Sequence, residues 1–259
     1  MLLFHRSFEW WRKDIYMTQT IKLFKRGFAS IVVGFCSLIH TQAQAVMGGG
    51  MGIMTPTAEI PQEGTFTGGM VWMEHEMMQT PFNYDTGLYY VSFAPFSWIE
   101  LTLRETLLKT WNRDHTCQRF YQQDRSLSLR LRLLKESHIR PAWVITAHDP
   151  YADRGKNYYA SLYSVWSKSL HNEWSGGKWC VSIGYSFPVN HSGFRKGLFG
   201  SIGYRPNFPL PCLIAAEYDS QNFNFGAEIT LWKHMRLFGC SQAWKHFSGG
   251  IAYTYTLTL

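Results

Sequence analysis

The residues best suited to chemistry in this sequence occur singly or in small groups, and "MEHEM" is the densest group. Its Glu74, His75 and Glu76 offer carboxylates and an imidazole, which serve in proton transfer and metal binding. Successive side chains of a strand point to opposite faces, so the two glutamates would share one face and His75 would take the other. The three side chains therefore need another strand in order to converge. We expect a solvated or lumenal strand end.

His148, Asp149 and Ser161 are the residue types of a hydrolase with a serine nucleophile. However, His148 and Asp149 begin "HDPYADRGKN", which has the composition of a turn, and no G-x-S-x-G motif surrounds Ser161. The Gly-rich stretch 47–52 lacks the strand and helix that flank a phosphate-binding loop, and it is interpreted as a flexible leader. We predict no catalytic residue, no metal site and no cofactor.

Four charged residues have a more regular placement, on the polar faces of two neighbouring alternating stretches: Glu100, Arg104, Arg130 and Arg132. One interpretation is that they form internal ion pairs that fill a narrow barrel, and we favour it. The other is a basic strip that binds an anionic polysaccharide through bidentate contacts between guanidinium and carboxylate groups.

The cysteines outside the N-terminal segment have no C-x-x-C spacing, so the sequence gives no support for a zinc or haem site. They are Cys117, Cys180, Cys212 and Cys240. An oxidising periplasm would permit a disulfide, but the sequence does not define a pair. We interpret them as small apolar residues at unrelated positions.

Alternation of apolar and polar residues predicts the elements that carry these side chains. The clearest stretches are "IELTLRETL", "SLSLRLRLL", "WCVSIGYSF" and "FNFGAEITL", each about as long as a membrane-crossing strand of ~9–11 residues. The chain ends in another, "IAYTYTLTL". Weaker strands are predicted at 65–75, 87–94, 141–147, 158–168, 197–205, 212–219 and 234–242. The total is about twelve antiparallel strands, within a range of 10–14.

The composition favours a transmembrane β-barrel over a soluble one. Charged residues make up 17% of the chain, against roughly a quarter in an average soluble domain. The polar faces carry mainly Ser, Thr and Gly, which suits a lumen, and the apolar faces offer more surface than a small interior can hold. The alternative is a soluble periplasmic β-barrel or sandwich that binds a ligand. In the membrane barrel, the last strand would face lipid with Tyr253 and Leu257 and the lumen with Thr254 and Thr256.

The N-terminal region has the features of a secretory signal peptide. A basic segment precedes the apolar stretch 28–39, and "AQA" ends at Ala45, which predicts cleavage before Val46. Met17 is the expected initiator. The domains are therefore a signal peptide at 1–45, a Gly-, Met- and Pro-containing leader at 46–63 and a barrel at 64–259.

The net charge of +7 is concentrated in the signal peptide. Six of the 25 Lys and Arg and two of the 18 Asp and Glu lie in residues 1–45, which leaves 19 basic and 16 acidic residues. This excess is too small to suggest nucleic-acid binding.

The last strand also resembles the C-terminal β-signal by which outer-membrane assembly machinery recognises its clients. The matching residues are Ser248, Gly250, Tyr253 and Tyr255, although four residues follow Tyr255. The expected partners are therefore outer-membrane lipid and this machinery.

Five stretches, in order, resemble the YjbH family of exopolysaccharide-associated outer-membrane proteins. They are "GMGIMTPTAEIPQEGTF", "YVSFAPFSWIELTLR", "QDRSLSLRLRLLKES", "HDPYADRGKNYYASLYSVWSK" and "AEYDSQNFNFGAEITL". Long members of the family contain more chain, so this protein would correspond to one barrel unit.

The resemblance implies a non-enzymatic barrel in the outer membrane of a Gram-negative bacterium, associated with exopolysaccharide production or export. Further partners would be an anionic polysaccharide and other export proteins. A barrel enzyme acting on lipid or polysaccharide is the alternative from another class.

Overall fold

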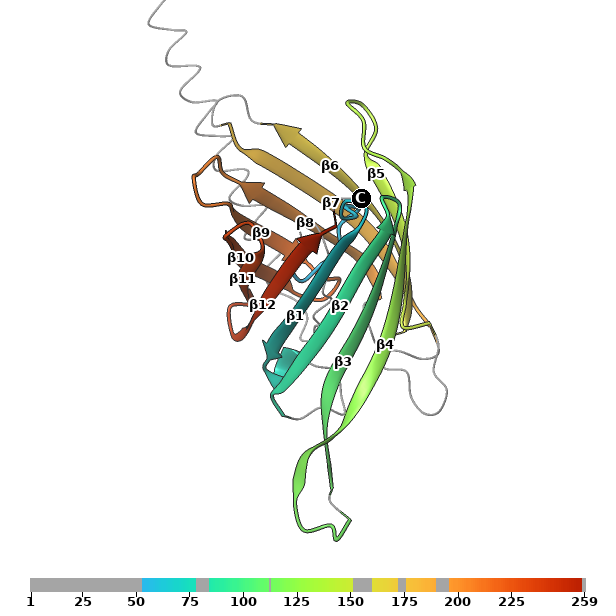
Figure 1. The fold of residues 1–259 in the computed structure, drawn as a ribbon, viewed down its shortest axis with the longest axis vertical. Coiled ribbons are helices and arrows are strands. Elements are labelled where there is room, and N and C mark those ends of the chain that lie inside the picture. The colour runs from blue at the N-terminus through green and yellow to red at the C-terminus, as the bar shows by residue number, and fades with distance from the viewer. Residues whose placement is uncertain are drawn as a thin grey trace, which may run out of the picture. The chain divides into compact units, whose positions relative to one another are not determined.

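The computed structural model describes residues 53–77, 84–111, 113–150, 160–171, 176–189 and 196–257. Each strand pairs antiparallel with the next along the chain, and the last pairs with the first, so that the sheet closes into a barrel (Figure 1). The strands are β1 (Thr65–Met73), β2 (Thr86–Phe96), β3 (Ile99–Trp111), β4 (Gln118–Leu134), β5 (Ala142–His148), β6 (Ser161–His171), β7 (Lys178–Pro188), β8 (Gly197–Arg205), β9 (Cys212–Tyr218), β10 (Phe223–Leu231), β11 (Met235–Gln242) and β12 (His246–Thr256). A 3-10 turn, η1 (His75–Met77), follows β1.

The predicted twelve-stranded antiparallel barrel is therefore confirmed. The signal peptide, its cleavage site between Ala45 and Val46, and the Gly-rich stretch 47–52 lie outside the described residues. In the part of the chain that the structure describes, no helix has the length and apolar character needed to span a membrane.

β12 closes the barrel against β1, which leaves neither strand with a free edge. Hydroxyl pairs continue the seam on the lumen side, with Thr65 and Thr256 oxygens 2.9 Å apart. The strand begins at His246, five residues before the predicted "IAYTYTLTL", because pairing continues through two glycines that carry no strand signal. At Gly250 a Cβ would approach the Phe238 ring to 2.6 Å, so the glycine permits close packing inside the barrel.

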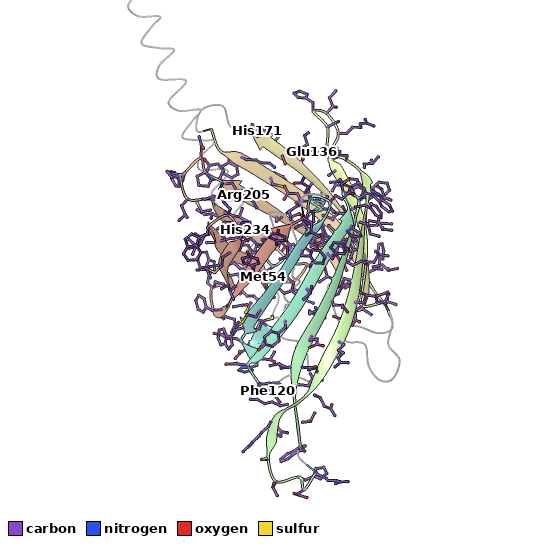
Figure 2. All side chains as sticks on the ribbon, viewed as in Figure 1. Met54, Phe120, Glu136, His171, Arg205 and His234 are labelled. Atoms are coloured by element: carbon purple, nitrogen blue, oxygen red, sulfur yellow. The ribbon has the colours of Figure 1, made fainter. Side chains whose placement is uncertain are left out.

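The two faces of the sheet divide as the alternation predicts. Small polar side chains of the wall are buried on the lumen side, including Thr102, Ser126 and Ser182. Large apolar side chains are exposed on the outside, and Figure 2 shows side chains projecting all round the wall. In β12, Tyr253 and Tyr255 are about half exposed, while Ala252 between neighbouring strands is buried. A soluble barrel would bury the apolar face instead.

We call the end where β1 begins and β12 ends the terminal rim, and the other end the opposite rim. At the terminal rim, β2 and β10 are followed by short turns, at 97–98 and 232–234. Glu136 and Arg205 lie at this end, and Phe120 lies at the other (Figure 2).

At the opposite rim, β3 and β4 extend beyond the other strands as a hairpin (Figure 1). β4 begins at Gln118, eight residues before the predicted strand "SLSLRLRLL", so the polar residues 118–123 belong to the sheet. Polar residues still pair here because the backbone ladder from β3 continues past a register shift at Leu108 and Lys109. The Lys109 ammonium lies 4.8 Å from the Tyr84 ring centroid and 5.1 Å from that of Phe120, which fastens the base of the hairpin.

Candidate functional site

The lumen contains part of the chain's own leader. Residues 53–62, which we call the plug, form neither a helix nor a strand and bend at 53–55 and at 58. Pro56 and Pro61 disfavour a helix and supply no backbone N–H. A segment without regular structure inside a barrel must find hydrogen-bond partners on the wall. The plug finds them on several strands.

Glu217 of β9 binds the N-terminal end of the plug. Its carboxylate accepts hydrogen bonds from the backbone N–H groups of Ile53, Met54 and Thr55, at 2.6, 2.7 and 2.8 Å. Glu217 and Thr55 are buried, at 3% and 0% exposure. A buried carboxylate with three N–H donors is a charge-assisted contact, stronger than neutral hydrogen bonds.

Arg130 of β4 binds the middle of the plug. Its Nη2 donates to the carbonyl oxygens of Thr57, at 2.5 Å, and Glu59, at 3.0 Å. Between these carbonyls, the Ala58 N–H donates to the Ser167 hydroxyl at 2.7 Å. The plug is therefore bonded to walls on different sides of the lumen.

Apolar contacts complete the packing of the plug. Ile53 and Met54 belong to a buried cluster with wall residues that include Met73 and Leu88. Gly226 leaves the space for Ile53, because a Cβ at that glycine would lie 2.6 Å from the Ile53 Cδ1. The predicted leader at 46–63 thus contains a segment with a fixed place in the barrel.

The four charged residues predicted to face the lumen all do so, but they do not form one strip. Arg130 and Glu100 form a buried ion pair at 2.5 Å. The Arg104 Nη1 lies 3.3 Å from the Nε2 of His148. Arg132 lines a cavity at the terminal rim.

His148, Asp149 and Ser161, which the sequence did not favour as a nucleophile set, lie where β5 ends and β6 begins. His148 ends β5, where the sequence suggested a turn, and its Nδ1 lies 2.5 Å from the Ser128 hydroxyl. Ser161 is the register partner of His148 on β6, yet among the described residues its hydroxyl has no hydrogen-bond partner. His148 is buried between Ser128 and Arg104.

Glu74 and Glu76 acquire a partner that sequence reasoning missed. His246 of β12 places its Nδ1 3.3 Å from Glu74 and 3.8 Å from Glu76, and ligand atoms of the three lie within 4.8 Å of one another. His75 lies with its Nε2 3.0 Å from Glu76 and its Nδ1 3.2 Å from Asp85. This donor set could hold a cation, but ion pairing to the imidazole accounts for the same geometry. Only the pairing of β1 with β12 brings His246 here.

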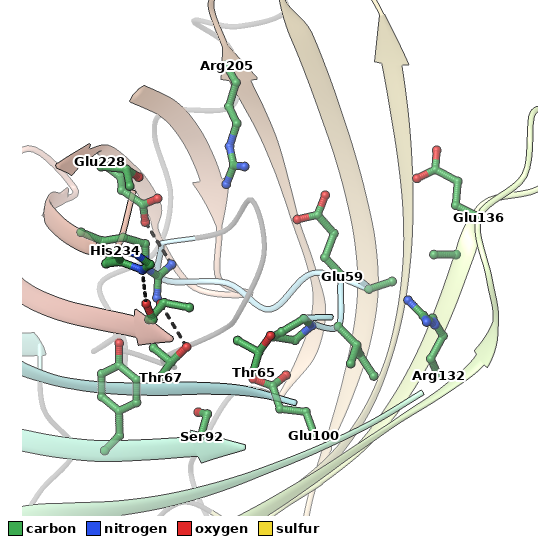
Figure 3. A pocket seen from close by; sticks show the side chains of 18 of the residues that line it. Glu59, Thr65, Thr67, Ser92, Glu100, Arg132, Glu136, Arg205, Glu228 and His234 are labelled. Carbon is green, nitrogen blue, oxygen red and sulfur yellow. Dashed lines mark hydrogen bonds and ion pairs between the residues drawn. The ribbon is translucent and has the colours of Figure 1, made fainter. Parts of the chain in front are cut away.

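A cavity of about 510 Å³ opens between the plug and the wall at the terminal rim (Figure 3). Glu59, Ile60 and Pro61 of the plug form part of its lining. The wall contributes hydroxyls and charged groups from several strands and turns: Thr65, Thr67, Ser92, Glu100, Arg132, Lys135, Glu136, Arg205, Glu228, Lys233, His234, Arg236 and Thr254.

Glu136 stays ionised at this rim. Burial alone would raise its pKa, but hydrogen bonds from Ser169 and the nearby Lys168 ammonium outweigh burial and hold the pKa of Glu136 below its usual value. The Ser169 N–H donates to this carboxylate at 2.7 Å, and the Lys168 Nζ lies 3.4 Å away.

Two other sets of predicted residues can be placed. Of the four cysteines, those at 180, 212 and 240 are free thiols. In the C-terminal signal, Ser248 faces the lumen and donates to the Trp72 carbonyl at 2.8 Å, whereas Tyr253 and Tyr255 face outward. Recognition of Ser248, Gly250, Tyr253 and Tyr255 by assembly machinery remains a prediction.

The fold and site define a closed twelve-stranded barrel with part of its own leader in the lumen. The chain belongs to the YjbH family, since the model of that family, described as exopolysaccharide biosynthesis protein YbjH, matches residues 44–256. The resemblance predicted from the five sequence stretches is confirmed.

Comparison with solved structures finds barrels with little sequence identity. The KdgM porin aligns with a TM-score of 0.49 and 7% identity, over 75% of this chain and 99% of the porin. An outer membrane channel from Pseudomonas putida F1 aligns with a TM-score of 0.41 and 9% identity, over 77% of this chain and 98% of the channel. No curated protein matches the chain.

Proposed function

We propose that this chain is a non-enzymatic outer-membrane barrel that takes part in exopolysaccharide production or export. The observation that carries the proposal is the reversed distribution of polarity: the barrel buries polar side chains and exposes apolar ones. Large aliphatic and aromatic side chains are exposed on the outside of strands around the barrel, and a soluble monomer rarely exposes so large a patch. Lipid is the solvent that such a surface requires, and a closed barrel leaves no backbone group unpaired in it.

Charged side chains on the outward face lie towards the ends of strands. Glu105 and Arg125 pair at 3.3 Å where the β3–β4 hairpin leaves the barrel. Lys168, near the terminal rim, reaches the Ser137 and His138 carbonyls of the adjoining turn. This placement resembles snorkelling at a membrane boundary. Trp98 and Trp232 are exposed at the terminal rim and Trp111 and Trp244 at the opposite rim, where aromatic girdles lie in outer-membrane barrels.

The terminal rim would face the periplasm. In bacterial outer-membrane barrels, periplasmic turns are short and outer loops are longer. The turns at 97–98 and 232–234 and the connection at 74–85 follow this pattern. The rim cavity and the plug would then meet a polysaccharide before it crosses the membrane.

Two measurements test the proposal. After fractionation, the protein should occur in the outer membrane and show heat-modifiable migration on a gel. Deletion of the gene should reduce the exopolysaccharide at the cell surface, and the intact gene should restore it. Recovery of the protein without detergent, or an unchanged polysaccharide yield, would contradict the proposal. Hydrolysis of lipid or polysaccharide by pure protein, abolished by His148→Ala, would favour the enzymatic alternative.

A further inference from the structure

The charges around the rim cavity are unevenly balanced. Each carboxylate in the lining has a cation close by: Glu59 with Lys178 at 3.6 Å, Glu100 with Arg130 at 2.5 Å, Glu136 with Lys168 at 3.4 Å, and Glu228 with Arg236 at 3.3 Å. Within the described ranges, the lining cations Arg132, Lys135 and Lys233 have no carboxylate within 4.0 Å. The cavity therefore carries an excess of positive charge.

These three cations come from different elements. Arg132 lies on the lumen face of β4, Lys135 follows that strand, and Lys233 lies in the turn between β10 and β11. Figure 3 shows the Arg132 side chain at the edge of the cavity. A guanidinium can bind a carboxylate through two parallel hydrogen bonds, whereas the ammonium groups act as point charges.

The remaining lining suits a polyhydroxylated ligand. Thr65, Thr67, Ser92 and Thr254 bring hydroxyls that both donate and accept hydrogen bonds. Tyr90, with Ile60 and Pro61 of the plug, supplies apolar surface, against which the C–H faces of a sugar ring could pack. The volume of about 510 Å³ falls in the range of small-molecule sites, roughly 300–1,000 Å³.

We propose that this cavity binds carboxylate-bearing sugar units of an acidic polysaccharide. Arg132 would hold a sugar carboxylate, Lys135 and Lys233 would add long-range attraction, and the threonine hydroxyls would bond the ring substituents. This inference rests on the proposed function and names the chemical class of its substrate. It also assigns the plug a role, since residues 59–61 form one wall of the site.

The test uses the folded full-length mature protein in detergent and calorimetric titration with hexagalacturonate. Maltohexaose is the neutral probe and hexaglutamate is the probe with the same number of carboxylates on a peptide. Hexagalacturonate should bind with an affinity that falls as salt rises. Arg132→Gln should weaken binding about tenfold, the effect of losing ~1.4 kcal/mol, and Lys233→Gln should weaken it about threefold. Lys245→Gln, the same charge change at the opposite rim, should change the affinity by less than about twofold.

Each contrary result has a defined meaning. Equal binding of maltohexaose, or no binding of hexagalacturonate, would overturn the inference. Equal binding of hexaglutamate would also overturn the inference, because the cavity would then recognise carboxylate groups without the sugar. Unchanged affinity in both Arg132→Gln and Lys233→Gln, each confirmed as folded by heat-modifiable migration, would remove the ligand from this cavity. Loss of surface polysaccharide on gene deletion without hexagalacturonate binding contradicts only this inference, whereas binding with unchanged polysaccharide contradicts only the proposed function.

Discussion

At the scale of single residues, Glu217 couples the plug to the wall through three backbone N–H groups. In Glu217→Gln the charge is lost and an amide NH2 faces backbone donors, so the plug should loosen while the barrel stays closed. Hydrogen exchange of residues 53–55 should rise at least tenfold, which corresponds to a loss of ~1.4 kcal/mol. Glu105→Gln, which removes a carboxylate from the outer hairpin, is the control. Equal exchange in Glu217→Gln and the intact protein would show that this carboxylate does not hold the plug.

Arg130 forms an ion pair with Glu100 and also donates hydrogen bonds to two backbone carbonyls of the plug. Arg130→Gln leaves Glu100 buried without its cation, and the loss of one partner from a buried pair costs about 3–5 kcal/mol. The free energy of unfolding in urea, measured for the protein in lipid, should fall by that order. The double variant Glu100→Gln/Arg130→Gln removes the unpaired charge and should recover part of the loss. A double variant less stable than Arg130→Gln would contradict this explanation.

The alternation of the strands predicted which face of the sheet carries each charged residue. The period placed Glu100, Arg104, Arg130 and Arg132 on the lumen side. It could not place Glu217 or His246 in a site, because their partners come from the plug and from Glu74 and Glu76, far away in the sequence. Contacts between residues so far apart in the sequence depend on barrel closure and on the path of the plug. The plug has no hydrophobic period from which that path could be predicted.

At the scale of elements, all twelve strands could be predicted, because each buries one face and exposes the other. The errors lie at strand ends and in the plug. Polar residues extend β4 beyond the apolar belt, and two glycines hide the first half of β12. The plug was not recognised as an internal segment because Pro, Thr and Ala give no signal that distinguishes a buried irregular segment from a surface loop.

Residues of β12 should lie at different depths of the membrane. Ile251 lies near the middle of the strand, opposite Met70 of β1, whereas Tyr255 is next to its last residue. An arginine on a lipid-facing position costs roughly 2–4 kcal/mol at the membrane midplane and about 0–1 near the interface. Ile251→Arg should therefore reduce the folded fraction in bilayers much more than Tyr255→Arg. Equal losses in the two variants would contradict the depth assigned to this strand, unless assembly in cells rather than refolding is measured, since Tyr255 belongs to the predicted β-signal.

At the scale of the whole molecule, the barrel proposed to lie in the outer membrane contains part of its own leader in its lumen. The family membership connects this architecture to exopolysaccharide biosynthesis. The plug occupies part of the lumen, with residues 53–58 buried beside the wall. Passage of a solute would require the plug to move, and its contacts with Glu217 and Arg130 are the ones that must break.

The ionic conductance of single molecules in planar lipid bilayers tests whether the plug blocks the lumen. The intact protein is compared with a variant in which residues 53–60 are replaced by an equal length of Gly and Ser, both shown to be folded by heat-modifiable migration. Both proteins should insert, the intact protein should conduct weakly, and the variant should open in larger unitary steps. Equal unitary conductance would contradict a blocking role for the plug. Failure of the folded intact protein to insert would contradict the membrane barrel itself.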